Sequence, residues 1–302
     1  MTRVLVTGGT GFLGKAVCRE LEASGYDDIV ALGSKDCDLR DQVATQKMVN
    51  DSGAGVVLHL AATVGGIGAN KENPGRFMYE NLVMGTNVIE ASRSAGVDKF
   101  VMVGTVCAYP KFTPVPFKEE EIWNGYPEET NAPYGVAKKA LMQLICSYKE
   151  QYGFNGINLI PVNMYGPFDN FDPKISHVIP ALILKFHTCE EVEIWGNGSA
   201  SREFLYVDDC ARAIRLAMEN HNDPSPINIG TGSEISIKDL AHKVKDVVGH
   251  TGQLYFNSSY PNGQPRRCLD TSKAKEAFGF EATVSLDEGL RQTVEWFNSN
   301  LA

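Results

Sequence analysis

The sequence lacks both an apolar run long enough to cross a membrane and an excess of positive charge. No hydrophobic stretch approaches the ~20 residues that span a bilayer. The 302 residues include 28 Lys and Arg against 37 Asp and Glu, which gives a formal net charge of −9. This acidic balance argues against nucleic acid or an anionic membrane as the main partner. We therefore expect neither among its partners, and expect any anionic ligand to be met by locally clustered cations.

Cysteine is present but forms no recognisable framework. The seven cysteines lie at positions 18, 37, 107, 146, 189, 210 and 268. Their odd number and scattered spacing match neither a disulfide set nor a metal-binding motif. Residues 1–6 run directly into a strand pattern, without the basic and apolar regions of a signal peptide. We expect reduced thiols, no bound metal and a cytoplasmic location.

A glycine-rich loop stands between the first predicted strand and the first predicted helix. Residues 4–7 form a short apolar run that is typical of a buried parallel strand. Gly8, Gly11 and Gly14 follow at a spacing that lets a backbone approach a pyrophosphate lying on a helix N-terminus. In that context the loop predicts a nucleotide site rather than a tight turn. The residues expected to line it are Gly8, Thr10, Gly11, Phe12, Leu13 and Gly14.

Residues after the second and third strands are expected to complete the dinucleotide site. An acidic residue at the tip of the second strand binds the 2′-hydroxyl of NAD, whereas a cation there accommodates the 2′-phosphate of NADP. Ser34 and Lys35 precede Asp36, which favours NADP(H), although Lys35 also fits an ordinary solvated loop residue. The remaining expected contacts are Asp38 and Leu39 under the adenine, and the small residues Ala61 and Ala62 after the third strand.

Repeated strand–helix units predict an α/β fold with a doubly wound parallel sheet of the Rossmann type, followed by a smaller substrate-binding lobe. We place the dinucleotide-binding domain at residues 1–165 and the smaller lobe mainly at 166–302, with some later segments returning to the first domain. Residues 63–70 are expected to form a glycine-rich loop over a ligand, and Asp208 is expected to cap a helix. Thr105 and Cys107 follow a strand at residues 100–103, so they belong to the edge of the sheet where ligands bind.

Tyr134 and Lys138 are four residues apart in a predicted helix, so their side chains share one face. A nearby ammonium favours the phenolate and lowers the pKa of a tyrosine. Tyr134 would then donate a proton to a carbonyl oxygen as hydride reaches its carbon. Most pairs with this spacing lie on a solvated helix surface. The spacing therefore indicates a catalytic pair only together with the glycine loop and the strands described above.

These motifs together make the chain similar to the extended short-chain dehydrogenases/reductases. Five further segments, at residues 64–67, 107–111, 163–171, 176–180 and 195–204, resemble the GDP-L-fucose synthase family. That resemblance covers nearly the whole chain. It implies 3,5-epimerisation and NADPH-dependent 4-reduction of GDP-4-keto-6-deoxy-D-mannose, a GDP-linked keto-sugar, by a homodimer.

The resemblance also implies a role for individual residues. Thr105 and Tyr134 would act on the C4 oxygen, Lys138 would hold the nicotinamide ribose, and Cys107 and His177 would exchange protons at C3 and C5. Tyr134, Lys138 and His177 would also contact the cofactor. The expected sugar-nucleotide contacts are Asn163, Lys185, Trp195, Arg202 and Arg267. The chain departs from the family pattern in Thr105 for serine, in Phe168 for a frequent histidine, and in Thr10, which is not basic.

Other interpretations stay open from the sequence. Cys107 alone would more often be an inert buried thiol, His177 a structural histidine, and Trp195 part of a core. The same constellation would also suit another GDP-keto-sugar, such as a heptose or a dideoxy sugar. A protein that senses NADP without turnover is a third reading, which the intact Tyr134, Lys138 and Cys107 disfavour.

Overall fold

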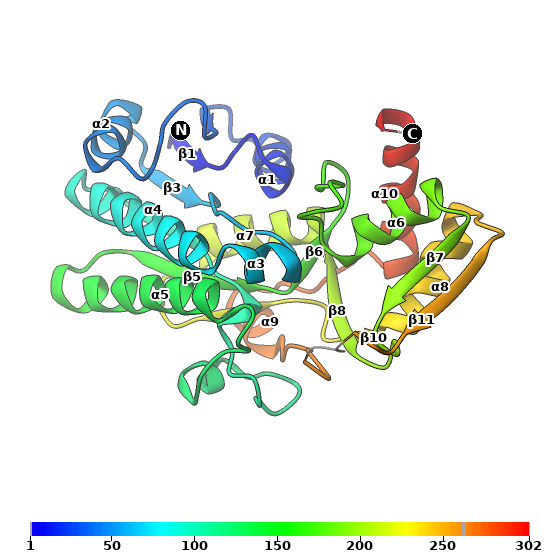
Figure 1. Cartoon of the computed structure of the whole chain (residues 1–302). Helices are drawn as coiled ribbons and strands as arrows, with labels where there is room; N and C mark the ends of the chain where they lie inside the picture. Colours follow the sequence, from blue (N-terminus) through cyan, green and yellow to red (C-terminus); the bar gives the residue numbers. More distant parts are fainter. Residues whose placement is uncertain (1, 261–263, 302) are drawn as a thin grey trace.

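The computed structural model describes residues 2–260 and 264–301 and arranges them in two lobes (Figure 1). The larger lobe holds a parallel sheet between two layers of helices, and the smaller lobe holds two short sheets covered by further helices. The predicted fold class is therefore confirmed.

The main sheet contains six strands in the order β2-β1-β3-β4-β5-β9, with every neighbouring pair parallel. The chain begins at β1, moves outward to β2 and then returns past β1 to β3, so the winding direction reverses between β1 and β3. In such sheets a ligand binds beyond the carboxyl ends of the strands at this reversal. The strands are β1 (Val4–Thr7), β2 (Ile29–Leu32), β3 (Val56–His59), β4 (Lys99–Val103), β5 (Gly156–Pro161) and β9 (Ile227–Ile229).

Alternate strand residues face opposite helix layers, as the pleat of a strand requires. Leu5 and Val57 pack into a core shared with α2, α4 and α5, whereas Val4 and Val6 pack into one shared with α1, α7 and α9. Burial on both faces explains why these strands are continuous apolar runs in the sequence. The helices are α1 (Phe12–Ala23), α2 (Gln42–Ser52), α4 (Pro74–Ser94), α5 (Ala132–Tyr152), α7 (Val207–Asn220) and α9 (Ser272–Phe278).

The chain passes between the two lobes more than once. β6 (Asn163–Tyr165), just before the predicted boundary, pairs with β8 (Ser201–Tyr206) outside the main sheet. α7 and β9 then return to the larger lobe, where Arg215 of α7 lies 2.7 Å from Glu20 of α1. A boundary at residue 165 thus describes only the first of these crossings.

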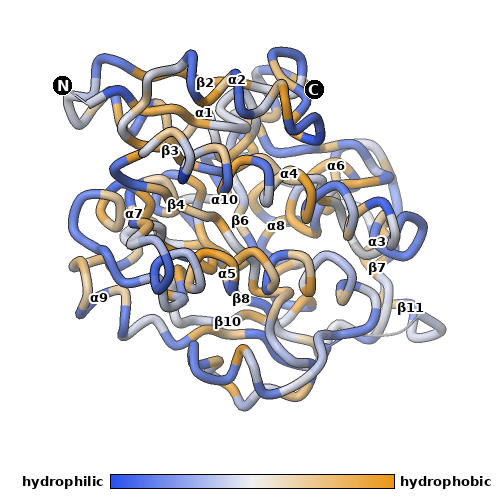
Figure 2. The backbone as a smooth tube through the Cα atoms, turned by 90° about the vertical axis from the view of Figure 1, so that its left-hand side faces the viewer, coloured by the Kyte–Doolittle hydropathy of each residue, from blue (hydrophilic) through white to orange (hydrophobic). Residues whose placement is uncertain are grey.

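The smaller lobe is built around its own apolar core. β8 pairs with β6 and with β10 (Glu234–Ser236), and β7 (Glu191–Trp195) pairs with β11 (Gln253–Asn257). Apolar residues of three helices close over these strands. For the molecule as a whole, Figure 2 shows hydrophobic segments toward the middle and hydrophilic loops around the outside. The helices are α6 (Val178–Thr188), α8 (Ile237–Val248) and α10 (Leu286–Asn300).

Two local expectations are wrong in detail. The segment expected to be a loop at residues 63–70 contains the start of a short helix, α3 (Ile67–Glu72). Asp208 does not cap α7, because that helix begins one residue earlier, after Tyr206. Asp208 instead lies in the first turn, 2.6 Å from Arg19 of α1, where a carboxylate still complements the helix dipole. Two 3₁₀ helices, η1 (Val106–Ala108) and η2 (Glu119–Trp123), lie between β4 and α5.

Candidate active site

The glycine loop after β1 is shaped to receive an anion at the N-terminus of α1. Gly8 has φ +77°, a left-handed conformation that favours glycine, and a Cβ at Gly14 would overlap the carbonyl oxygen of Gly8. Gly11 precedes the helix without a side-chain cap, and the first turn carries no acidic residue. The helix dipole and backbone N–H groups therefore face the position that a pyrophosphate takes in this motif. The loop fits a dinucleotide.

The segments that follow β2 and β3 lie against the same loop. A Cβ at Gly33 would overlap the hydroxyl of Thr10, and a Cβ at Gly8 would meet the backbone of Ala61. Ser34 and Lys35, which follow Gly33 directly, are exposed. The structure thus gathers the glycine loop with the two segments expected to hold the adenosine half of the cofactor. Phe12, Leu13 and Ala62 lie within or next to these segments.

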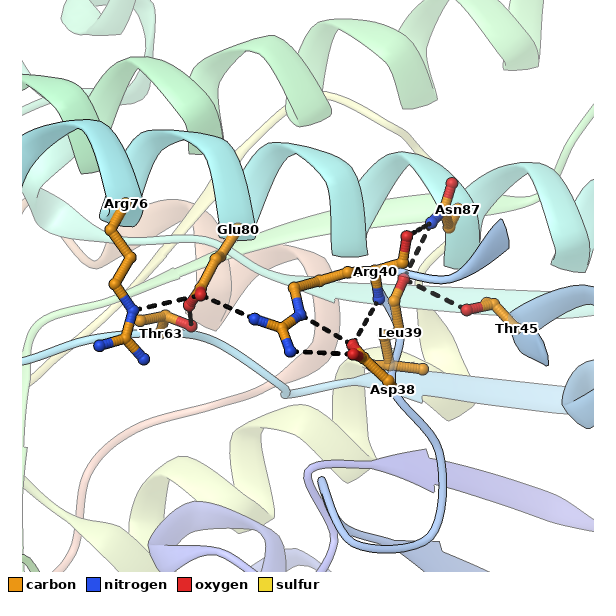
Figure 3. A network of polar contacts seen from close by, with 8 residues as sticks. All are labelled: Asp38, Leu39, Arg40, Thr45, Thr63, Arg76, Glu80 and Asn87. Atoms are coloured by element: carbon orange, nitrogen blue, oxygen red, sulfur yellow. Dashed lines mark hydrogen bonds and ion pairs between the residues drawn. The ribbon is translucent and has the colours of Figure 1, made fainter. Parts of the chain in front are cut away.

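An ion-pair network that the sequence analysis missed fixes the chain just after these residues (Figure 3). Arg40 donates to Asp38 at 2.9 and 2.8 Å and to Glu80 of α4 at 2.9 Å. Glu80 is only 8% exposed and also accepts from Arg76 and from the hydroxyl of Thr63, which follows β3. The network ties the segment after β2 to the segment after β3. Charges at residues 40 and 80 gave no signal in the sequence because their pairing depends on the packing of α4.

This network restricts Asp38 and Leu39, the two residues predicted to lie under the adenine. Asp38 is held by Arg40, and the side chain of Leu39 is buried in the core between the sheet and the helices α2 and α4. The carbonyl oxygen of Leu39 accepts from Asn87 at 2.9 Å. Among the cations after β2, Arg40 is already paired, while Lys35 makes no hydrogen bond or ion pair to another described residue.

Tyr134 and Lys138 are both buried in α5, at 7% and 2% exposure, so they are not part of a solvated helix surface. Burial raises the pKa of Tyr134, the charge of Cys107 raises it further, and a hydrogen bond with Thr105 lowers it. The expectation that Lys138 lowers the tyrosine pKa is therefore not met, because desolvation of the buried phenol is the largest effect on it. The Lys138 Nζ donates to the carbonyl oxygen of Val103 at 3.0 Å, and burial lowers its pKa to about 8.

His59, at the end of β3, is a buried neighbour of Lys138 that the sequence analysis did not consider. Burial and the nearby Lys138 charge lower the pKa of His59 to about 3. Its Nδ1 lies 2.8 Å from the hydroxyl of Thr7, the last residue of β1. The His59 imidazole is therefore neutral at pH 7, where it lies at the carboxyl end of β3 beside that of β1.

Cys107 lies in η1 directly against α5. A Cβ at Gly135 would overlap the carbonyl oxygen of Cys107, so glycine is required for this close approach. The Cys107 N–H donates to the Thr105 hydroxyl at 3.2 Å, and the thiol is close enough to Tyr134 to affect its pKa. The structure therefore brings together Thr105, Cys107 and Tyr134, as predicted from their strand and helix positions.

Arg267, from a segment 160 residues further on, reaches the same thiol. Its Nη1 lies 3.7 Å from Cys107 Sγ. The arginine is only 8% exposed, and Gln264, 6% exposed, accepts two of its N–H groups at 3.2 and 3.0 Å. Gln264 is a further residue that the sequence analysis missed. A glutamine in a loop carries no motif, and only the folded chain shows what it binds.

Arg202 of β8 is the second guanidinium in this region. Burial lowers the pKa of Arg202 to about 10, and the positive charge of Arg267 adds to the effect. The next residue, Glu203, is fully buried, and its backbone carbonyl accepts from the Asn163 amide at 3.0 Å. Three predicted sugar-nucleotide contacts, Asn163, Arg202 and Arg267, are thus connected in space.

His177 is placed at the start of α6, in the smaller lobe. Its side chain is exposed, yet protein atoms surround it on several sides and this burial lowers the pKa of its imidazole. The preceding residues pack against the segment after β3: the Gly66 N–H donates to the Ile175 carbonyl at 3.0 Å. His177 is therefore held beside the chain that leaves the carboxyl end of β3.

The last two predicted contacts lie further out in the smaller lobe. The Lys185 Nζ on α6 donates to the carbonyl oxygen of Glu193 on β7 at 2.9 Å. Trp195, at the end of β7, is 60% exposed and stacks on Tyr260 with ring centroids 4.5 Å apart. Trp195 is therefore not lobe core, and its free face is available for a planar ligand.

Two further findings concern residues 2–260 and 264–301 only. Within them, no helix is long and apolar enough to cross a membrane. No cluster of three or more His, Cys, Asp or Glu side chains in the same ranges is arranged to hold a metal ion.

These features define the class of protein. A dinucleotide loop at the reversal of a doubly wound sheet, with a tyrosine, a lysine and a thiol at the same edge, is the arrangement of a nicotinamide-dependent enzyme that acts on a ligand held by a second lobe. The model of the NAD dependent epimerase/dehydratase family matches residues 4–230, and the chain belongs to that family.

Comparison with individual proteins gives a narrower likeness. A probable GDP-L-fucose synthase 1 of Oryza sativa subsp. japonica is 41% identical over 99% of this chain and 93% of its own length. A GDP-6-OMe-4-keto-L-xylo-heptose reductase from C. jejuni matches with TM-score 0.94 at 31% identity, over 99% of this chain and 98% of its own. A GDP-L-fucose synthetase from Naegleria fowleri bound to NADP matches with TM-score 0.91 at 31% identity, over 99% and 96%. The resemblance to the GDP-L-fucose synthase family is confirmed.

Proposed function

We propose that the protein converts GDP-4-keto-6-deoxy-D-mannose into GDP-L-fucose, by epimerisation at C3 and C5 followed by NADPH-dependent reduction at C4. The observation that carries the proposal is the meeting of Cys107, Tyr134 and Thr105 at the carboxyl edge of the sheet, with Arg202 and Arg267 beside them. The likeness to GDP-L-fucose synthases over 99% of the chain supports the choice of sugar.

Epimerisation uses two groups on opposite faces of the sugar. The C4 ketone acidifies the protons at C3 and C5, because the carbanion is delocalised onto the carbonyl oxygen. Cys107, as thiolate, removes a proton from one face, and His177, when protonated, returns one to the other. Burial lowers the pKa of His177, which makes its protonated form the stronger acid. Each inversion is an isomerisation that consumes no reductant and leaves the proton on the thiol and the imidazole neutral. Proton exchange with water restores both groups.

Reduction uses Tyr134 as the general acid. Nicotinamide, when bound, supplies the hydride for C4. Tyr134 protonates the C4 oxygen, which becomes a hydroxyl, while the Thr105 hydroxyl hydrogen-bonds the same oxygen. Lys138, fully buried with a pKa lowered to about 8, holds the nicotinamide ribose and supplies positive charge beneath the phenol. Burial keeps Tyr134 protonated, as an acid must be before it donates.

The remaining predicted contacts bind the two nucleotides. The diphosphate of the sugar donor is met by Arg202, Arg267 and Lys185, and the guanine by the exposed face of Trp195. Asn163 contacts the sugar. On the cofactor side, Ser34 and Lys35 receive the 2′-phosphate, which makes NADP(H) the preferred cofactor. Asp38, the backbone of Leu39, Ala61 and Ala62 line the adenosine half, while the Leu39 side chain stays in the core.

The test is a single assay on the purified chain. GDP-4-keto-6-deoxy-D-mannose and NADPH should yield NADP⁺ and a product whose proton NMR couplings show the L-galacto configuration of fucose. Tyr134→Phe should abolish NADPH oxidation while solvent deuterium still enters C3 and C5. Absence of both exchange and oxidation in the unaltered chain would refute the proposal.

A second candidate is an epimerase or reductase for another GDP-keto-sugar. The structural likeness to a reductase of a GDP-keto-heptose favours it, because the same thiol, imidazole and phenol would serve. Parallel assays with the deoxy-hexose and heptose ketones separate the two by the ratio of kcat/KM. Any turnover of NADPH would at the same time exclude a non-catalytic NADP sensor.

We also infer a homodimer that functions in the cytoplasm. Met78 and Tyr79 of α4 and Tyr152 of α5 are 39%, 62% and 51% exposed, and α4 and α5 pack side by side at the surface of the larger lobe (Figure 1). If two copies of the chain met through the surface formed by α4 and α5, these helices from both copies would form a four-helix interface. Light scattering on Tyr79→Glu should report a monomer, whereas Val43→Glu on α2 should leave the dimer intact. A monomeric unaltered chain would contradict the inference.

A further inference from the structure

We propose that Arg267, oriented by Gln264, is a positioning residue that stabilises the thiolate form of Cys107. The family resemblance implies only a sugar-nucleotide contact for Arg267. The structure places its Nη1 3.7 Å from Cys107 Sγ, within the range of a hydrogen bond to sulfur. This inference deepens the proposed function, since it concerns the residue that acts there as the base.

Hydrogen bonds to Gln264 hold the Arg267 guanidinium in place for this contact. Arg267 is 8% exposed, and the side-chain amide oxygen of Gln264 accepts from both its Nε and its Nη2. Gln264 is itself 6% exposed, and its amide donates to the Lys111 carbonyl at 3.0 Å. The two bonds to Gln264 occupy the Nε–Nη2 edge of the guanidinium and leave Nη1 directed at the sulfur. A planar, permanently charged group held in this way loses little conformational freedom when it pairs with an anion.

None of the other charged and titratable groups around Cys107 in the described part of the chain hydrogen-bonds its sulfur as Arg267 does. Tyr134 of α5 faces Cys107 and is neutral, because burial raises its pKa. Arg202 of β8 adds a second positive charge near both Cys107 and Arg267, and Glu128, before α5, and Glu234 of β10 face Arg202. Two neighbouring guanidinium groups repel each other unless an anion lies between them. An anion at the Cys107 sulfur would meet that need, and the diphosphate would add to it when the substrate binds.

The neighbouring arginine gives a matched control. Arg266 is one residue away, but its guanidinium points to Glu234, with Nε 2.8 Å from Oε1, and its side chain is 59% exposed. Removal of its charge alters the same loop without touching the thiol. Arg266→Gln and Arg267→Gln therefore differ mainly in whether a cation is lost beside Cys107.

The test is the pH dependence of Cys107 alkylation by iodoacetamide, read peptide by peptide by mass spectrometry and without sugar or nucleotide. Arg267→Gln should move the midpoint of the profile upward and slow alkylation at pH 7 about tenfold, as expected when a cation is lost from beside an ionisable group. Arg267→Lys should restore part of the shift. Arg266→Gln should leave the profile unchanged. Equal profiles for Arg267→Gln and Arg266→Gln would overturn the proposal.

Gln264→Leu keeps the assay decisive if Arg267→Gln does not fold. It frees the guanidinium without removing its charge, so the midpoint should move in the same direction by a smaller amount, and an unchanged midpoint in folded Gln264→Leu would overturn the proposal. Alkylation involves no substrate, so it tests this inference separately from the proposed function. If the alkylation midpoint shifts but the unaltered chain does not turn over the sugar, the proposed function is refuted and this inference stands. If the sugar is turned over but the midpoint does not shift, this inference is refuted and the proposed function stands.

Discussion

The carboxylate of Glu203 accepts the backbone N–H of Leu269 at 2.7 Å, at a site where Glu203 is fully buried. Its other oxygen accepts the N–H groups of Thr231 and Gly232 at 2.5 and 2.8 Å. One side chain of β8 thus fixes the turn after β9 and the segment that carries Arg267. Through these backbone hydrogen bonds, a single carboxylate of the smaller lobe connects β8 to the segment after β9 and to the segment that carries Arg267.

Glu203→Gln should be strongly destabilising. The amide can accept on one side only, so its NH₂ group would face a buried N–H donor and leave both unpaired. Such a loss costs about 2–4 kcal/mol, and urea denaturation measures it. Glu129→Gln is the matched control, because Glu129 is 65% exposed and pairs with Lys111 at the surface, so its loss should cost less than about 1 kcal/mol. Similar costs for the two variants would contradict this account.

Cys107→Ser should separate the two reactions. A serine hydroxyl is too weak an acid to form the base at neutral pH, so solvent deuterium exchange at C3 and C5 should fall by at least about a hundredfold. NADPH oxidation should continue slowly, with the unepimerised ketone as substrate. Cys189→Ser alters an exposed thiol of the smaller lobe and should change neither rate. Normal epimerisation by Cys107→Ser would show that another group is the base.

Lys35→Ala should weaken NADPH binding much more than NADH binding. Lys35 is exposed after β2, and a charged contact to the 2′-phosphate is worth roughly 1.5–3 kcal/mol, or at least about tenfold in affinity. Titration of the cofactor against intrinsic fluorescence measures both constants. Lys47→Ala on α2, where the lysine is paired with Asp51, serves as control. An equal loss for NADPH and NADH would exclude contact with the 2′-phosphate.

Asp169 should make stability fall as pH rises. Burial raises its pKa to about 7, while an unfolded aspartate titrates near 4. The folded chain therefore holds the extra proton between these values, so the group's contribution is present at low pH and is lost as pH rises towards 7. Asp169→Asn keeps the side chain neutral. The free energy of unfolding of the variant, minus that of the unaltered chain, should increase by roughly 1–4 kcal/mol between pH 4 and pH 8.

Urea denaturation at the two pH values checks this trend. The comparison is unaffected by any constant cost of the new amide, because only the change with pH is read. Asp172→Asn alters an exposed carboxyl in the same segment and should show little dependence on pH. A difference between Asp169→Asn and the unaltered chain that stays flat with pH would show that the carboxyl is ionised in the folded protein.

Patterns among neighbouring residues were enough to predict the local elements and the residues at their ends. The glycine loop, the buried strands and the positions of Thr105 and Cys107 after β4 follow from patterns that involve neighbours in the chain. Because parallel strands align their carboxyl ends, those patterns already predicted one shared edge. The spacing of Tyr134 and Lys138 likewise placed both on one helix face, although it did not show that burial raises the pKa of Tyr134.

Contacts between charges that are far apart in the chain could not be predicted in this way, because they depend on the folded arrangement of the elements. Arg267 and Cys107 are 160 residues apart, and Arg40 reaches Glu80 across the gap between the chain after β2 and α4. Glu203 binds N–H groups of two later segments, and β9 returns to complete the main sheet. No periodicity records such contacts, because each depends on how separate elements pack. That packing brings the Cys107 thiol and a loop arginine within hydrogen-bond distance of each other.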